Sequence, residues 1–264
     1  MKTPNLAVCL DDLRLDLKEA MNRAGAMGFR AVDLAATDGP VSPDELSQTG
    51  RRHLRRHLED LGLRLASLRG PVGGPAYGHD AAGERRLDEM RKVIRLAASL
   101  RVPTVSTTIG AFEDSGTADR TAALRETLTT LADDADYSGV VVAVETTDIS
   151  ATLLAQMLAD IACPFLAACC DSGAMLMRSE DPCHVGEVLP GRIRLVRARD
   201  AVPSSSQETG HEVTHGQGLL NAERFLAALA EAGFCGDIVL TRTTGADPVA
   251  DLNHARSQFQ MLLG

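Results

Sequence analysis

The sequence predicts an α/β fold of the (β/α)8 type, in which eight parallel strands close into a barrel inside a ring of helices. Short apolar runs alternate regularly with helical patterns, and the alternation repeats eight times, which is typical of a parallel sheet. Several of these runs show no polar alternation, as expected of strands covered on both faces. The length of 264 residues is close to the roughly 250 residues of one such barrel. No linker or change of composition divides the chain, so we expect one domain over residues 1–264.

Eight short runs rich in valine, leucine, isoleucine and alanine predict the strands. The run from Gly139 to Thr147 is the clearest, because four valines and an alanine lead directly to a lone carboxylate, Glu145. The run from Phe165 ends in the same way, at Asp171. The predicted strands cover residues 5–10, 30–34, 63–68, 103–109, 139–145, 165–171, 192–198 and 237–241.

Capping signals and apolar stripes predict the helices between these strands. Asp11 or Asp12 is expected to cap a helix that runs to about residue 27, and the Ser-Pro-Asp-Glu segment at 42–45 has the pattern of a capping box. Further helices are predicted near residues 87–97, 124–135, 152–161, 181–189, 222–232 and 248–263. The polar segment 202–218 is expected to form a loop.

Composition excludes several classes of function. No apolar run approaches the roughly 18 residues of a membrane helix, and the N-terminal residues show no signal-peptide pattern. The six cysteines form no Cys-x-x-Cys pair, so we expect reduced thiols in a cytoplasmic protein. The formal net charge of −9 disfavours a nucleic-acid partner, which requires a basic surface. No glycine-rich dinucleotide motif precedes a helix, so no nucleotide cofactor is expected.

Two carboxylates mark the candidate site. Glu145 and Asp171 each end a predicted strand and share the inward parity of the residues two positions before them. Active sites of parallel barrels lie at the carboxyl ends of the strands. We therefore expect both acids to lie in a polar site at that end of the barrel.

Several local patterns carry a resemblance to a known family. They are Gly-Phe-x-x-Val-Asp-Leu at 28–34, Leu-x-x-Leu-Gly-Leu-x-Leu-Ala-Ser at 58–67, Val-Ala-Val-Glu-Thr at 142–146, Cys-Asp-Ser-Gly at 170–173, Gly-Arg-Ile-Arg-Leu-Val-Arg-Ala-Arg-Asp at 191–200, Gly-Gln-Gly at 216–218 and Ala-Leu-x-x-Ala-Gly-Phe-x-Gly-Asp-Ile-Val-Leu at 228–240. In this order and spacing the chain resembles the xylose-isomerase-like TIM barrel family. That family includes sugar and sugar-phosphate isomerases and epimerases, among them the tagatose-epimerase type. The resemblance covers almost the whole chain.

The resemblance implies a divalent metal, Mn²⁺ or Mg²⁺, held by Glu, Asp, His and Glu at the ends of strands five to eight. The first two ligands fall on Glu145 and Asp171, but the third position is Arg197 and the fourth is Thr241. An arginine has no lone pair to offer a metal and stays protonated. The sequence therefore favours an arginine–carboxylate cluster in place of the ion, and one of the two family bases is missing.

Two main hypotheses follow. In the first, the protein is a sugar isomerase or epimerase in which Glu145 is the acid/base, Asp171 its partner and Arg197 the electrophile. In the second, it is a non-catalytic barrel that binds a carbohydrate-like or anionic ligand. A third interpretation, an apurinic-site endonuclease, is disfavoured because the chain lacks a histidine-rich metal site and a basic face for DNA.

A few further residues are candidates for contacts to a small sugar-like or anionic substrate. Residues available for sugar stacking are few, such as Tyr77 and Phe112. A symmetric homo-oligomer is expected only from the general frequency of such assemblies. The candidates for polar substrate contacts are Arg199, His79, Thr241 and Arg242.

Overall fold

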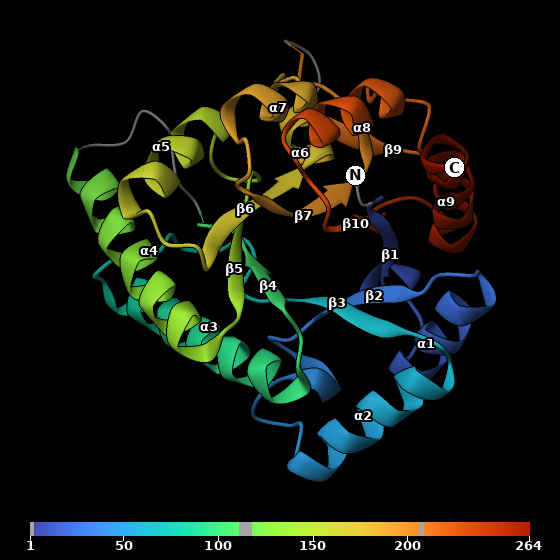
Figure 1. Cartoon of the computed structure of the whole chain (residues 1–264), viewed down its shortest axis with the longest axis horizontal. Coiled ribbons are helices and arrows are strands. Elements are labelled where there is room, and N and C mark those ends of the chain that lie inside the picture. The colour runs from blue at the N-terminus through green and yellow to red at the C-terminus, as the bar shows by residue number, and fades with distance from the viewer. Residues whose placement is uncertain (1–2, 111–117, 206–208) are drawn as a thin grey trace.

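The computed structural model, which describes residues 3–110, 118–205 and 209–264, confirms the predicted barrel (Figure 1). Its parallel strands close in the order β1-β10-β7-β6-β5-β4-β3-β2, so the first and last strands of the chain pair with each other. The barrel strands are β1 (Asn5–Cys9), β2 (Ala31–Ala35), β3 (Arg64–Arg69), β4 (Thr104–Thr107), β5 (Val141–Glu145), β6 (Leu166–Asp171), β7 (Ile193–Ala198) and β10 (Asp237–Leu240).

Helices surround the barrel on its outer side (Figure 1). They bury their apolar stripes against the strands, as expected of the outer layer of this fold. None of the helices in the described part of the chain is long and apolar enough to cross a membrane. The helices are α1 (Leu17–Ala26), α2 (Gln48–Asp60), α3 (Ala81–Leu100), α4 (Ala118–Ser138), α5 (Ala151–Ile161), α6 (Ser172–Met177), α7 (Val185–Val188), α8 (Ala222–Glu231) and α9 (Pro248–Leu263).

Two predicted helix starts are wrong. Neither Asp11 nor Asp12 caps α1; the two residues lie in a single 3-10 turn that ends at Arg14 in the left-handed conformation. The side chain of Asp16 caps α1 instead, by accepting a hydrogen bond from the backbone of Glu19 at 2.9 Å. The start of α2 is also later than predicted.

The Ser-Pro-Asp-Glu segment at 42–45 closes only a short turn, in which the backbone N–H of Leu46 donates to the carbonyl of Ser42 at 2.9 Å. The helix begins at Gln48, after Ser47 accepts a hydrogen bond from the backbone of Gly50 at 3.1 Å. A second serine cap with a better helical continuation therefore overrides the first.

Two elements near the barrel mouth were not predicted. The first is the short helix α6, which begins directly after β6 and is capped by the side chain of Asp171. The second is an antiparallel pair, β8 (Asp200–Val202) and β9 (His211–Val213), within the segment predicted as a loop. Three-residue strands carry too little periodicity to be predicted from sequence.

The core has two layers. Large side chains from the helices pack on the outer face of the strands, where Phe29, Phe225 and Phe259 are fully buried. The barrel interior is filled by a separate cluster of mostly small side chains. Because the alanine and cysteine side chains fill little of the barrel interior, long polar side chains have room at the carboxyl ends of the strands. The interior cluster is Ala7, Cys9, Ala31, Ala66, Ala143, Cys169, Leu195 and Val239.

Candidate functional site

Arg197, at the end of β7, extends across the barrel and connects three other strands. Its Nε donates to Glu145 Oε1 on β5 at 2.9 Å, and its two terminal nitrogens donate to the Asp33 carboxylate on β2 at 3.0 and 3.3 Å. Nη2 also donates to Ser106 Oγ on β4 at 2.9 Å. The guanidinium therefore fills the centre of the mouth, where the strands converge.

These charges are removed from solvent. The side chains of Arg197, Asp33 and Glu145 are 3%, 0% and 4% exposed. Burial alone would lower the pKa of Arg197, but the charges of Asp33 and Glu145 raise it well above its ordinary value. Burial would likewise raise the pKa of Asp33, yet the charges of Arg197 and Arg69 and the hydrogen bonds from Arg197 and Ser67 together outweigh burial and lower it. Arg197 and Asp33 are therefore ionised together, as in a compensated buried ion pair.

Asp33 is oriented by an irregularity in the sheet. The register between β2 and β3 shifts after Val32, so that Asp33 lies opposite Ser67. The hydroxyl of Ser67 then donates to Asp33 Oδ1 at 2.5 Å. Without this extra residue in β3, a different side chain would face the carboxylate.

Asp171 lies beside Arg197 in the register of β6 and β7, but its carboxylate belongs to a neighbouring pair and makes no described hydrogen bond with the Arg197 side chain. Nε and Nη2 of Arg199 both donate to its carboxylate at 2.8 Å, and the backbone N–H of Ala174 donates at 2.9 Å. Burial would raise the pKa of Asp171, but the charge and hydrogen bonds of Arg199 lower it. Both oxygens are thus used by a bidentate arginine and a helix cap.

Glu212, on the unpredicted strand β9, joins two arginines at the mouth. It accepts from Arg199 Nη1 at 3.3 Å, from Arg242 Nη1 at 3.0 Å and from the Thr243 hydroxyl at 2.5 Å. Arg242 also donates through Nε to Asp251 Oδ2 at 2.7 Å. Two of the predicted substrate-binding arginines therefore already have carboxylate partners within the protein.

Thr241, the residue after β10, differs from these arginines because its polar atom has no described partner. Thr241 is 6% exposed, and its Oγ1 is buried with no hydrogen-bond partner among residues 3–110, 118–205 and 209–264. Beside it, the backbone N–H of Arg242 donates to Asp12 Oδ2 at 2.9 Å. Burial raises the pKa of this Asp12 carboxyl above its ordinary value. A hydroxyl and a carboxyl thus lie near the position where the family would place its fourth ligand.

The remaining candidates lie elsewhere or have other partners. His79 is 64% exposed and its Nε2 lies 2.8 Å from Glu126 Oε2, so it makes no described contact with the arginine cluster. Tyr77 is buried, and its hydroxyl lies 2.9 Å from Thr107 Oγ1, so its ring offers no open face for a sugar. Phe112 lies outside the described residues.

The side chains at the mouth do not fit the metal site that the resemblance implies. Glu145 and Asp171 are each bound by an arginine, and the guanidinium of Arg197 occupies the space between strands β2, β4 and β5. Among the residues that the structure describes, no three His, Cys, Asp or Glu side chains are arranged to hold a metal ion. A positive guanidinium next to the carboxylates would repel a divalent cation.

Sequence reasoning missed three members of the mouth: Asp33, Arg69 and Glu212. Asp33 and Arg69 were placed in or beside predicted strands without a role. A charged residue inside an otherwise apolar strand is itself a signal, because burying it is costly without a partner. Glu212 gave no such signal, since its position depends on the β8–β9 hairpin.

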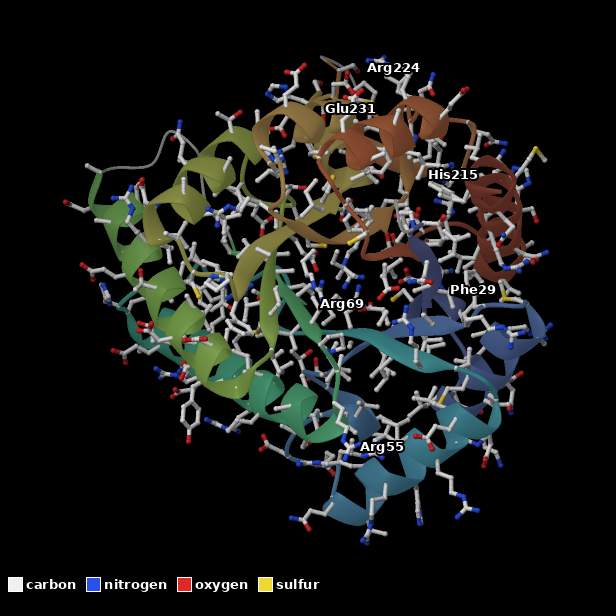
Figure 2. The ribbon with its side chains drawn as sticks, viewed as in Figure 1. Phe29, Arg55, Arg69, His215, Arg224 and Glu231 are labelled. Carbon is white, nitrogen blue, oxygen red and sulfur yellow. The ribbon has the colours of Figure 1, made fainter. Side chains whose placement is uncertain are left out.

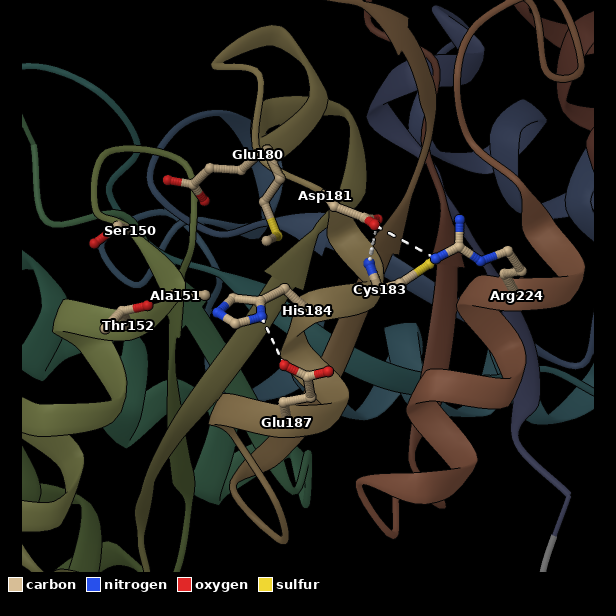
Figure 3. Close-up of a pocket in the computed structure, with 10 residues that line it drawn as sticks. Ser150, Ala151, Thr152, Glu180, Asp181, Cys183, His184, Glu187 and Arg224 are labelled. Atoms are coloured by element: carbon tan, nitrogen blue, oxygen red, sulfur yellow. Dashed lines mark hydrogen bonds and ion pairs between the residues drawn. The ribbon is translucent and has the colours of Figure 1, made fainter.

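A separate cavity of about 400 Å³ lies between the N-terminus of α5 and the α6–α8 region (Figure 3). His184 Nδ1 lies 3.2 Å from Glu187 Oε2, and the backbone N–H of Cys183 donates a hydrogen bond to Asp181 Oδ1 at 2.9 Å. Burial and the hydrogen bond with Asp181 raise the pKa of the Cys183 thiol to about 11. This thiol is therefore a poor nucleophile at neutral pH.

A closed parallel barrel with a polar cluster at the carboxyl ends of its strands defines a class of (β/α)8 proteins. The model of the family described as "Xylose isomerase-like TIM barrel" matches residues 21–258. The chain therefore belongs to the xylose isomerase-like TIM barrel family. The comparison with curated proteins finds no match.

Solved structures agree with this fold. A xylose isomerase domain protein from Planctomyces limnophilus is 20% identical with a TM-score of 0.80, covering 99% of this chain and 97% of that one. A D-psicose 3-epimerase, crystallised in the presence of D-fructose, is 14% identical with a TM-score of 0.77, covering 98% and 99%. A D-allulose 3-epimerase from Methylomonas sp., in complex with D-allulose, is 17% identical with a TM-score of 0.76, covering 99% and 98%. At these identities the likeness supports the fold.

Proposed function

We propose that this protein is a sugar isomerase or epimerase-type enzyme that moves a proton next to a carbonyl, with Glu145 as the acid/base. One observation carries the proposal: Glu145 Oε2 remains available. Its only described contact is with the Thr147 hydroxyl at 3.5 Å, whereas Oε1 is fixed by Arg197 at 2.9 Å. An oriented carboxylate with one open oxygen is suited to general base catalysis.

Arg197 supplies the positive charge in the proposed reaction. Four of its N–H groups are used by Asp33, Ser106 and Glu145, and one N–H on Nη1 has no described partner. Glu145 takes the proton from the carbon beside the carbonyl, and the carbonyl electron pair moves to oxygen. The C–H bonding pair becomes the C=C bond of an enediolate, whose oxygen is stabilised by Arg197. Glu145 then returns the proton to the same carbon, or to the former carbonyl carbon while the proton of the neighbouring hydroxyl passes to the enediolate oxygen.

Asp171 takes no part in this scheme as a proton-transfer group. Both of its oxygens accept hydrogen bonds from Arg199, and one also caps α6. We assign it the role of fixing Arg199 and the first turn of α6. This differs from the partner role expected from the sequence, and no step is assigned to a metal ion.

The hydrogen bonds of Asp171 favour the second candidate function, a barrel that binds a carbohydrate-like or anionic ligand without chemistry. One of the two family carboxylates at strand ends is neutralised completely, and the fourth ligand position carries a threonine. A single remaining base supports isomerisation less well than two.

The two functions are separated by proton exchange. The purified protein is incubated in D₂O with a panel of aldoses, ketoses and keto acids, and ¹H NMR records loss of the proton beside the carbonyl. We expect exchange with the wild type and at least a 100-fold slower rate with Glu145→Gln. The matched control is Glu187→Gln, an exposed glutamate of α7. No exchange with any compound, or equal exchange in Glu145→Gln, refutes the enzymatic proposal and leaves the binding barrel.

A further inference from the structure

Arg69 is the one arginine of the mouth that donates no hydrogen bond within the described residues. It ends β3, and Figure 2 shows it inside the ring of strands. Its side chain is 16% exposed, and its Nε is buried without a partner. The nearest carboxylate oxygen, Asp11 Oδ2, lies 3.6 Å from Nη2, which is too long for a hydrogen bond. A guanidinium carries five N–H donors, and none of those of Arg69 is used by a group in the described part of the chain.

In the described part of the chain, Arg69 makes no hydrogen bond with a neighbouring carboxylate, and most of the carboxylate oxygens near it have other partners. Its electrostatic neighbours include Asp33, Glu145 and Arg197. Asp33 and Glu145 accept their hydrogen bonds from Arg197. Asp11 Oδ2 accepts from the backbone N–H of Ala35 at 2.8 Å. Arg69 is thus held close to the cluster but excluded from its hydrogen bonds.

Two other groups at the mouth share this property. Thr241 Oγ1 is buried without a partner, and Glu145 Oε2 has only the long contact with Thr147. Arg69, Thr241 and Glu145 extend from different strands toward the same end of the barrel. Together they offer a cationic fork, a hydroxyl and an acceptor, which complement a ligand with one oxyanion and at least one hydroxyl.

The charge balance selects the kind of oxyanion. Arg69 and Arg197 bring two guanidinium groups, and the carboxylates of Asp11, Asp33 and Glu145 face them, so the set carries no excess positive charge before a ligand binds. A singly charged carboxylate adds less repulsion beside these acids than a doubly charged phosphate. The planar fork of an arginine also matches the two oxygens of a carboxylate.

We propose that Arg69 binds the carboxylate of the ligand, and that the ligand is a small hydroxy or keto acid. The proposal rests on the proposed function only in placing the ligand at the same barrel mouth. Arg69 is then a specificity-determining residue, which distinguishes acids from neutral sugars. Glu145 keeps its proposed role of moving the proton on the carbon beside the carbonyl.

The test is calorimetric titration of the wild-type protein with C3 to C6 aldonates, each matched by the polyol and the sugar phosphate of the same length. We expect saturable binding of at least one aldonate, and weaker binding of its polyol and phosphate. Arg69→Gln should weaken that binding by about 10- to 100-fold, as expected for loss of a charged hydrogen-bonding group, and Arg69→Lys should recover part of it. Arg55→Gln, on the outer helix α2, is the matched control for loss of one charge (Figure 2). Circular dichroism spectra establish that each variant is folded.

Outcomes separate this proposal from the proposed function. Aldonates that bind no better than polyols, or an Arg69→Gln variant with unchanged affinity, overturn the assignment of Arg69. Tighter binding of the phosphates would replace carboxylate by phosphate as the ligand group and would also overturn it. If aldonates bind through Arg69 but no compound exchanges its proton, the assignment stands and the enzymatic function fails. If neutral ketoses exchange and aldonates do not bind, the reverse holds.

Discussion

Removing the guanidinium of Arg197 should destabilise the fold more than any surface substitution. Arg197→Met leaves Asp33 and Glu145 buried without a counter-charge, at side-chain exposures of 0% and 4%. Breaking a buried ion pair by removing one partner costs about 3–5 kcal/mol. Four hydrogen bonds at 2.9–3.3 Å are lost in the same change. For a chain of this size the expected fall in Tm is roughly 6–20 °C.

Equilibrium urea unfolding at pH 7, followed by circular dichroism, measures this loss. Arg194→Met is the matched control, because Arg194 is an exposed residue of the same strand, and its effect should stay within about 0.5 kcal/mol. Adding Asp33→Asn and Glu145→Gln to Arg197→Met should recover part of the stability, because neutral amides require no counter-charge. A loss below about 1 kcal/mol in Arg197→Met, or no recovery in the triple variant, would refute the reasoning.

Two further predictions concern charge at the mouth. Arg197→His combined with Thr241→Glu restores the ligand types of the family. Excess Mn²⁺ should then raise the Tm by about 5–10 °C in the double variant only. Thermal melts with and without EDTA measure this shift, and an equal shift in the wild type would contradict the prediction. The pKa of Asp33 lies below its ordinary 3.8 in the folded protein, so its ionised form stabilises the fold above that pH. This contribution should be lost as the pH falls from 3.8 through the folded pKa. Unfolding free energies from pH 7 to 2.5 should therefore fall more steeply in the wild type than in Asp33→Asn, and parallel curves would exclude the effect.

The barrel could be predicted from the sequence because its strands are short, buried and separated by regular helices. Predicted and observed strands differ by one or two residues at most ends, for example residues 103–109 against Thr104–Thr107. The helix starts were less predictable, since Ser42 and Ser47 both carry capping patterns and only one continues into a helix. Local chemistry alone does not decide between two such caps.

The chemistry of the mouth was predictable only along single strands. Strand parity places Glu145 and Arg197 inside the barrel, and the structure brings them together at 2.9 Å. The expected contact between Arg197 and Asp171 is absent among the described side chains, because Asp171 pairs with Arg199 instead. Asp33 could not be assigned to Arg197, since the two lie 164 positions apart and meet across the barrel. Pairings of that kind depend on barrel closure and register, which a single sequence does not specify.

The arginine across the barrel gives its cation an unusual property for a member of this family. A guanidinium attached to β7 by covalent bonds cannot dissociate, exchange with another ion or be removed by a chelator. Its charge is also fixed across the physiological pH range, because the charges of Asp33 and Glu145 raise its pKa further despite burial. The positive charge of Arg197 is thus present in every copy of the protein, because the arginine is part of the polypeptide. It is independent of the supply of metal ions in the surroundings.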